Sequence, residues 1–211
     1  MERMLGIHDF GLFVLAGLAL NITPGPDTLY IVGRSLAQGR RAGAVSVLGI
    51  CTGSLVHTAA AAIGVSVLLA RSAAAFTFLR WAGAAYLLYL GIRMLMAPKS
   101  NDDAIAKPPR DASTWNVYRQ AATTNILNPK VALFFLAFLP QFVRPDSPHR
   151  MLAMLLLGIV FVANGSIWCL AVAWFAAAVS RRWRERRTAS QWLSRSTGAL
   201  FVGLGVQVAR G

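Results

Sequence analysis

Two charged residues stand next to prolines inside otherwise apolar sequence. Asp27 closes the stretch 21–27, which reads Asn-Ile-Thr-Pro-Gly-Pro-Asp, and Lys130 closes the stretch 125–130, which reads Asn-Ile-Leu-Asn-Pro-Lys. A charge within a membrane is costly and persists where it is paired, hydrated or functional. A carboxylate can bind an ammonium group or a proton, and a lysine can bind a carboxylate. The two stretches therefore predict a polar site for a solute that carries both charges.

The sequence around these stretches is that of a membrane protein. Hydrophobic residues make up 56% of the 211 residues and charged residues 14%, whereas a soluble domain carries roughly 25% charged residues. The apolar residues form segments near the roughly 20 residues that cross a bilayer core. We predict six spans, of which the last is the weakest, over residues 10–36, 42–70, 74–96, 118–143, 151–179 and 193–209.

A polar stretch divides the predicted spans into two groups of three. Residues 98–113 contain Pro108-Pro109 and three aspartates. We therefore expect a first half over 1–97, a cytoplasmic linker over 98–117 and a second half over 118–211. Because each half has an odd number of spans, the second half is inverted relative to the first, as in inverted-repeat transporters. The predicted fold is all-α, with the first helix of each half broken.

The distribution of basic residues predicts the orientation of the spans. The net charge is +13, and the basic residues lie in short loops beside apolar spans, which argues against nucleic-acid binding. The loops after the first, third and fifth spans hold fourteen lysines and arginines, and the opposite side holds six. The positive-inside rule places those three loops in the cytoplasm. Both termini are then expected on the outer side.

The prolines predict that both broken spans lose helical structure. Proline lacks an N–H and clashes with the preceding turn, and unwound backbone in a membrane must be buried in protein or line a wet cavity. Side chains that could satisfy the freed groups or contact a solute are Asn21, Thr23, Asn125 and Asn128. We expect the breaks to meet near the midplane, with Asp27 and Lys130 facing one cavity. A packing kink, or a purely structural Asp27–Lys130 salt bridge, is the simpler alternative.

Other polar residues within the spans have weaker signals. His57 is expected to be a hydrogen-bonded packing residue, and Gly49 with Gly53 forms a GxxxG pattern suited to close helix packing. Side chains of the fifth span that could line the cavity are Asn164, Ser166 and Trp168. The sequence contains no nucleotide-binding motif, metal-ligand cluster or catalytic motif. We therefore predict no enzyme activity and no cofactor, and transport driven by an ion gradient.

The motifs around the two breaks are similar to those of a known family. The stretch 21–27, the Gly33-Arg34 pair and the stretch 39–43 resemble the opening of the lysine/homoserine exporter (LysE/RhtB) family. The stretches 84–91 and 125–135 resemble its third and fourth spans. The resemblance covers nearly the whole chain. The Pro-Gly-Pro and Asn-Pro-Lys elements, about 100 residues apart, are a specific pair of signals.

The resemblance implies export of amino acids or close derivatives from a bacterial cytoplasm in exchange for protons. It implies a multi-pass protein of the inner membrane and leaves a homo-oligomer open. Carried over position by position, the functional candidates are Asn21, Pro24, Gly25, Pro26, Asp27, Asn125, Asn128, Pro129 and Lys130.

Three other functions are compatible with parts of the sequence. A membrane carrier of thiol electrons would use Cys51 and Cys169, one in each half, although they lie away from the prolines in sequence and have no charged neighbour. An exporter of metal ions or other small cations would use Asp27, although soft metals prefer clusters of Cys, His or Met. A scaffold would have no need of broken helices with buried charge.

Overall fold

The computed structural model describes residues 5–71 and 112–178, together with isolated positions between 74 and 96. The sixth predicted span, most of the third and most of the linker lie outside the described residues. The described chain is helical and has no strand, apart from one isolated bridge between Ile7 and Val143. The predicted all-α class is therefore confirmed for this part of the chain.

The first broken span is interrupted where the prolines predict it. α2 (Phe10–Ile22) ends at Thr23, which has extended backbone angles, and α3 (Pro26–Arg71) begins at Pro26. Proline suits the first position of a helix because its fixed φ is already helical and its missing N–H would be unpaired there anyway. The Pro-Gly-Pro sequence thus ends one helix and starts the next.

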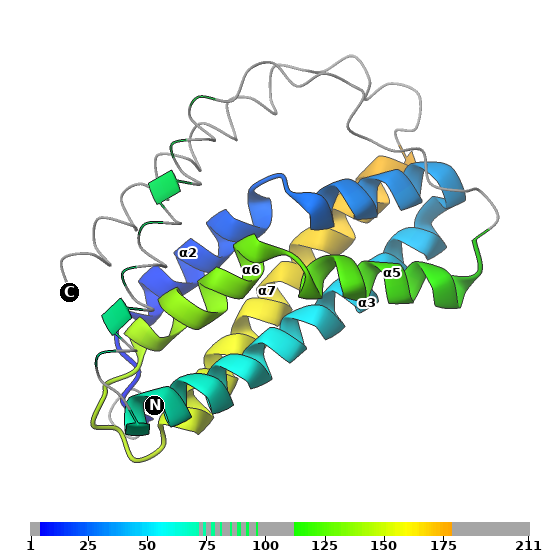
Figure 1. Ribbon diagram of the computed structural model, residues 1–211. Coiled ribbons are helices and arrows are strands. Elements are labelled where there is room, and N and C mark those ends of the chain that lie inside the picture. Colours follow the sequence, from blue (N-terminus) through cyan, green and yellow to red (C-terminus); the bar gives the residue numbers. More distant parts are fainter. Residues whose placement is uncertain are drawn as a thin grey trace.

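α3 covers both the rest of the first span and the second span. Its backbone leaves helical geometry at Gly39, where φ is 81° and ψ is −172°. A positive φ of this size favours glycine because it has no Cβ. Figure 1 shows the chain doubling back within α3, from the medium-blue pass to the cyan one. Gly39 thus separates the first two predicted spans.

The second broken span consists of four short helical segments. α5 (Thr114–Ile126) is followed by α6 (Pro129–Leu133), a π-helical turn η2 (Phe134–Phe138) and a 3₁₀ turn η3 (Leu139–Phe142). The segment before the break, Thr114–Ile126, and the segment after it, Pro129–Phe142, form an angle of 49°. α5 starts four residues before the predicted boundary, because the Ser113 hydroxyl accepts a hydrogen bond from the Asn116 N–H and caps the helix. The interruption at Pro129 is confirmed.

The described helices fit a membrane protein in length and composition. α7 (Arg150–Ala178) is long and apolar enough to cross a bilayer, α3 contains such a segment within residues 26–64, and the bent pair around Pro129 adds a third candidate if it is one span. α2 is a shorter apolar helix. The six-span count and the orientation in the membrane stay predictions.

The two broken spans lie antiparallel to each other along their length. Ile7 bridges Val143 at one end, and Gln38 donates a hydrogen bond to the Ala112 carbonyl at the other. Between these ends, Tyr30 donates to the Val117 carbonyl. Figure 1 shows α2 with the first pass of α3 running in the opposite direction to α5 and α6.

The second pass of α3 pairs with α7 in the same antiparallel way. Gly43 lies against Ala173, Cys51 contacts Ser166, and Thr58 lies against Gly158. Corresponding spans of two inverted halves are expected to pair in this way.

Candidate substrate site

The two helix breaks meet, and Asp27 lies at the junction. The side-chain amides of Asn125 and Asn128 donate hydrogen bonds of 2.8 and 3.1 Å to its Oδ2. Asp27 also lies in the first turn of α3, where the unpaired N–H groups of a helix favour negative charge. The only acid predicted within a span is therefore stabilised by one helix terminus and by two amides from the other half.

Lys130 makes the reciprocal contact with the end of α2. Its Nζ donates to the carbonyl oxygens of Leu20 at 3.0 Å and Thr23 at 3.1 Å. In a continuous helix the Leu20 carbonyl would accept from residue 24, but proline has no N–H to donate. A cation is also favourable at the carboxyl end of a helix. Lys130, which is 9% exposed, thus replaces a backbone donor that Pro24 removes.

The structural salt bridge considered from the sequence is not observed. Within the described part of the chain no salt bridge joins Asp27 to Lys130. Asp27 instead accepts from two amides of the opposite half, and Lys130 donates to carbonyl oxygens at the end of α2. Two of the three Nζ hydrogens of Lys130 are committed to carbonyl oxygens, and Lys130 and Asp27 thus have separate partners.

Asn125 connects the junction to the second pass of α3. Its Oδ1 accepts from the Ser54 hydroxyl at 3.3 Å, and its backbone oxygen lies 3.1 Å from His57 Nε2. The His57 ring also stacks on Phe135, with centroids 6.0 Å apart. A Cβ on Gly53 would lie 2.5 Å from Asn125 Oδ1. The packing roles predicted for His57 and Gly53 are therefore confirmed.

Asn128 makes two side-chain hydrogen bonds at the second break. Its Oδ1 accepts from the Lys130 N–H at 3.0 Å and caps α6, while its Nδ2 contacts Asp27. Pro129 occupies the start of α6, as Pro26 does in α3. Gly25 leaves room for the lysine, since a Cβ there would lie 3.2 Å from Lys130 Nζ.

A small cavity of about 20 Å³ adjoins the junction. One water needs about 10–15 Å³ measured in this way, so the cavity accommodates a single water. Residues that line it are Asn21, Ile50, Cys51, Ser54, Phe161, Val162, Gly165, Ser166 and Cys169. Asp27 and Lys130 are not among them, contrary to the expectation that both face one cavity. Lys130 instead donates to backbone carbonyl oxygens at the end of α2, outside this cavity.

The two cysteines lie at one cavity, which was not expected from the sequence. Cys51 and Cys169 line the same cavity, and both are free thiols. The Cys51 sulfur lies 2.9 Å from the Ser166 hydroxyl. They are more than 100 residues apart, and no local signal connects them. The antiparallel pairing of α3 with α7 brings both to the cavity.

A second polar cluster, also missed, joins α3 to α5. Arg34 is 1% exposed and lies within α3. Its guanidinium donates to the Tyr30 hydroxyl at 3.2 Å, to Gln38 at 3.2 Å and to Gln120 at 2.6 Å. This cluster ties the two broken spans together away from the break.

Comparison with known proteins identifies the family of this chain. A family model described as LysE type translocator matches residues 18–211. The chain belongs to this family. The resemblance seen in the sequence is thereby confirmed, and the translocator is a multi-pass membrane transport protein of the inner membrane.

Individual relatives cover nearly the whole translocator. An uncharacterized membrane protein of Pseudomonas aeruginosa is 31% identical over 97% of this chain and 96% of its own length. A homoserine/homoserine lactone efflux protein of Salmonella typhi is 29% identical over 93% of this chain and 94% of its own length. No solved structure matches the translocator.

Proposed function

We propose that this translocator exports amino acids or close derivatives across the bacterial inner membrane in exchange for protons. The family match and the Salmonella efflux proteins, one of which is 28% identical over 93% of this chain, support export of an amino-acid-type solute. The solute would bind where the two breaks meet. Residues proposed to form this site are Asn21, Pro24, Gly25, Pro26, Asp27, Asn125, Asn128, Pro129 and Lys130.

The proposal rests on the hydrogen bonding of the Asp27 carboxylate, whose two oxygens differ. Oδ2 is held by two amides, while Oδ1 is buried and has no hydrogen-bond partner among the described residues. A buried carboxylate oxygen without a donor is costly. An ammonium group of a solute, or a proton, would satisfy it. Asp27 is thus oriented by Asn125 and Asn128 and presents one oxygen to a cation.

Export in exchange for protons follows if the ammonium group of the solute and a proton compete for Asp27 Oδ1. A solute ammonium leaves on the outer side, a proton replaces it, and the proton leaves on the inner side. Alternating access requires the two halves to move relative to each other around the site. The hydrogen bonds from Asn125 and Asn128 to Asp27 join the halves, so their geometry would change in each cycle. Lys130 would hold the broken end of α2 throughout.

An efflux assay tests this function. The protein would be expressed in a bacterial strain without its own amino-acid exporters, and the cells loaded with dipeptides that release amino acids inside. We expect one or a few amino acids to appear outside faster than in control cells. Asp27→Asn should abolish the increase because a neutral amide cannot replace the charge. Asp146→Asn, at a side chain that is 75% exposed, is the matched control.

Three other results would have separate meanings. If Asp27→Asn exports normally with unchanged proton dependence, the function stands and the site assignment is wrong. If Asp146→Asn is equally inactive, the loss reflects expression and not binding. If no amino acid responds despite confirmed membrane insertion, the amino-acid proposal fails, and small metal cations are tested next in the same cells.

A further inference from the structure

Three buried polar atoms around the junction have no hydrogen-bond partner among the described residues. They are Asp27 Oδ1, Asn21 Nδ2 and Trp168 Nε1. Buried polar groups in native proteins are nearly always paired, and each exception needs an explanation. One of these atoms is an anionic acceptor, and the other two are N–H donors.

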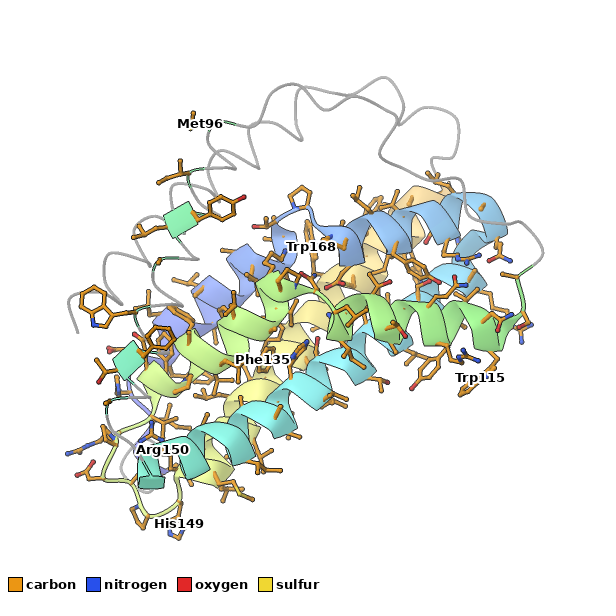
Figure 2. The ribbon with its side chains drawn as sticks, viewed as in Figure 1. Met96, Trp115, Phe135, His149, Arg150 and Trp168 are labelled. Carbon is orange, nitrogen blue, oxygen red and sulfur yellow. The ribbon has the colours of Figure 1, made fainter. Side chains whose placement is uncertain are left out.

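The two donors lie on the same side of the junction. Asn21, at the end of α2, lies against Gly165 of α7, where a Cβ would be 3.0 Å from the Asn21 amide nitrogen. Trp168 follows Gly165 by three residues, which places it on the adjacent face of the same helix. Figure 2 shows Trp168 on α7 at the level of the break between α2 and α3.

Trp168 shares an apolar cluster with residues of α3. Trp168 packs against an apolar cluster that includes Ile31 and Cys169. Ile31 follows Asp27 by four residues, one helical turn. The donors from α2 and α7 and the acceptor from α3 therefore belong to the same region, where α7 covers the broken span.

We propose that Asn21 and Trp168 bind the carboxylate of the transported amino acid while Asp27 Oδ1 binds its ammonium group. This inference rests on the proposed function and assigns the carboxylate to neutral donors instead of Lys130. Lys130 already donates to two carbonyl oxygens, whereas the Asn21 and Trp168 N–H groups have no acceptor among the described residues. A zwitterion would satisfy all three atoms at once.

The adjoining cavity agrees with a site that opens during transport. It is lined by Asn21 and by Gly165, and its 20 Å³ hold about one water molecule. An amino acid is larger than that. Binding of an amino acid here therefore requires α7 and the broken span to separate.

Paired probes with and without a carboxylate test the assignment. Binding to the purified full-length protein in detergent would be measured by thermal stabilisation, with L-homoserine, L-threonine, L-leucine and L-lysine, each beside its α-methyl ester. Trp168→Phe removes the N–H and keeps an aromatic ring. Trp174→Phe, on the same helix at a side chain that is 60% exposed, is the control. Asn21→Leu tests the second donor independently if the first variant does not fold.

We expect Trp168→Phe and Asn21→Leu to weaken binding of the free amino acid by roughly ten- to a hundredfold, the value of a hydrogen bond to a charged group. Binding of the methyl ester should fall much less, because its neutral carbonyl accepts a weaker hydrogen bond than a carboxylate does. Asp27→Asn should weaken binding of the free amino acid and binding of its methyl ester to the same extent. Trp174→Phe should bind both like the wild type.

The inference falls, and the proposed function stands, if Trp168→Phe and Asn21→Leu bind the acid like the wild type. It also falls if they lower the affinity for acid and ester equally, because that is the result of a purely structural role. If the wild type binds none of the four amino acids, the proposed function fails together with the inference.

Discussion

The side-chain amide of Asn125 donates a hydrogen bond of 2.8 Å to Asp27, which lies 98 residues earlier in the chain. Asn125 thereby joins the break in the first half to the break in the second. The same side chain accepts from Ser54 and packs over Gly53. Residues of three helical passes therefore meet at one amide, and this amide is the most direct point at which to perturb the site.

Replacing Asn125 by alanine should reduce export without unfolding the protein. Asp27 would keep only the Asn128 amide, and a hydrogen bond to a charged group contributes about 1.5–3 kcal/mol. We expect a loss of at least tenfold in the initial efflux rate. Asn116→Ala, at an exposed position of the same helix, should export normally. Equal rates for the two variants would show that Asn125 does not orient Asp27.

Gly53→Ala should displace Asn125. A Cβ at this position would lie 2.5 Å from Asn125 Oδ1 and 2.7 Å from Asn125 Cβ, and overpacking of this kind costs about 1–3 kcal/mol. We expect a lower thermal unfolding temperature in detergent and loss of export. Gly64→Ala is the control, since a Cβ there meets nothing within 4 Å. The control should be neutral or slightly stabilising, as alanine is the better helix former.

Lys130→Met should destabilise the broken end of α2. Methionine has a similar length but no N–H, so the Leu20 and Thr23 carbonyls would lose their donor. Each buried unsatisfied group costs about 1–3 kcal/mol. Thermal unfolding in detergent should show the loss, whereas Arg144→Met, at a side chain that is 65% exposed, should unfold like the wild type. A Lys130→Met protein that is as stable as the wild type would contradict the role assigned to the lysine.

Gly39→Ala should strain the turn between the first two passes of the chain. The cost comes from the backbone alone, because a Cβ at Gly39 meets nothing within 4 Å. A positive φ combined with an extended ψ costs a residue with a side chain roughly 1–3 kcal/mol. Gly11→Ala, where a Cβ is equally unobstructed and no positive φ occurs, should be tolerated. Comparable unfolding temperatures for the two variants would mean that the turn relaxes.

Serine at both cysteine positions should leave export intact. Cys51 and Cys169 line one cavity, which is the arrangement that an electron carrier would use, but a packing role requires only small side chains. Efflux from cells expressing the double variant Cys51→Ser, Cys169→Ser is therefore expected to match the wild type. Complete loss of activity, with normal membrane insertion, would favour the electron-carrier alternative.

Several features of this protein follow from local sequence alone. The missing N–H of Pro24, Pro26 and Pro129 interrupts a helix whatever lies beside it, and the structure interrupts both spans there. The length of an apolar segment likewise decides that it can cross a membrane. The sequence also shows directly that Asp27 and Lys130 stand next to the breaks.

The partners of those charges were decided by tertiary structure. The Asp27–Lys130 salt bridge, considered from the sequence as the simpler alternative, does not occur, and Asp27 contacts amides while Lys130 contacts carbonyls. The choice depends on the register in which the two broken spans pack, over a separation of about 100 residues, and no local pattern encodes that register. The same packing brings Trp168 to the junction.

What the sequence by itself determined was the membrane class, the two breaks and the residues that carry charge, because these depend on backbone chemistry and on the apolar run around each residue. What only the tertiary structure decided was which polar atoms are satisfied within the protein. Asp27 Oδ1, Asn21 Nδ2 and Trp168 Nε1 have no partner among the described residues, and the antiparallel packing of the helices left them so. The physical reason is that a hydrogen bond needs two groups at a defined distance, and only the packed fold sets distances between remote residues.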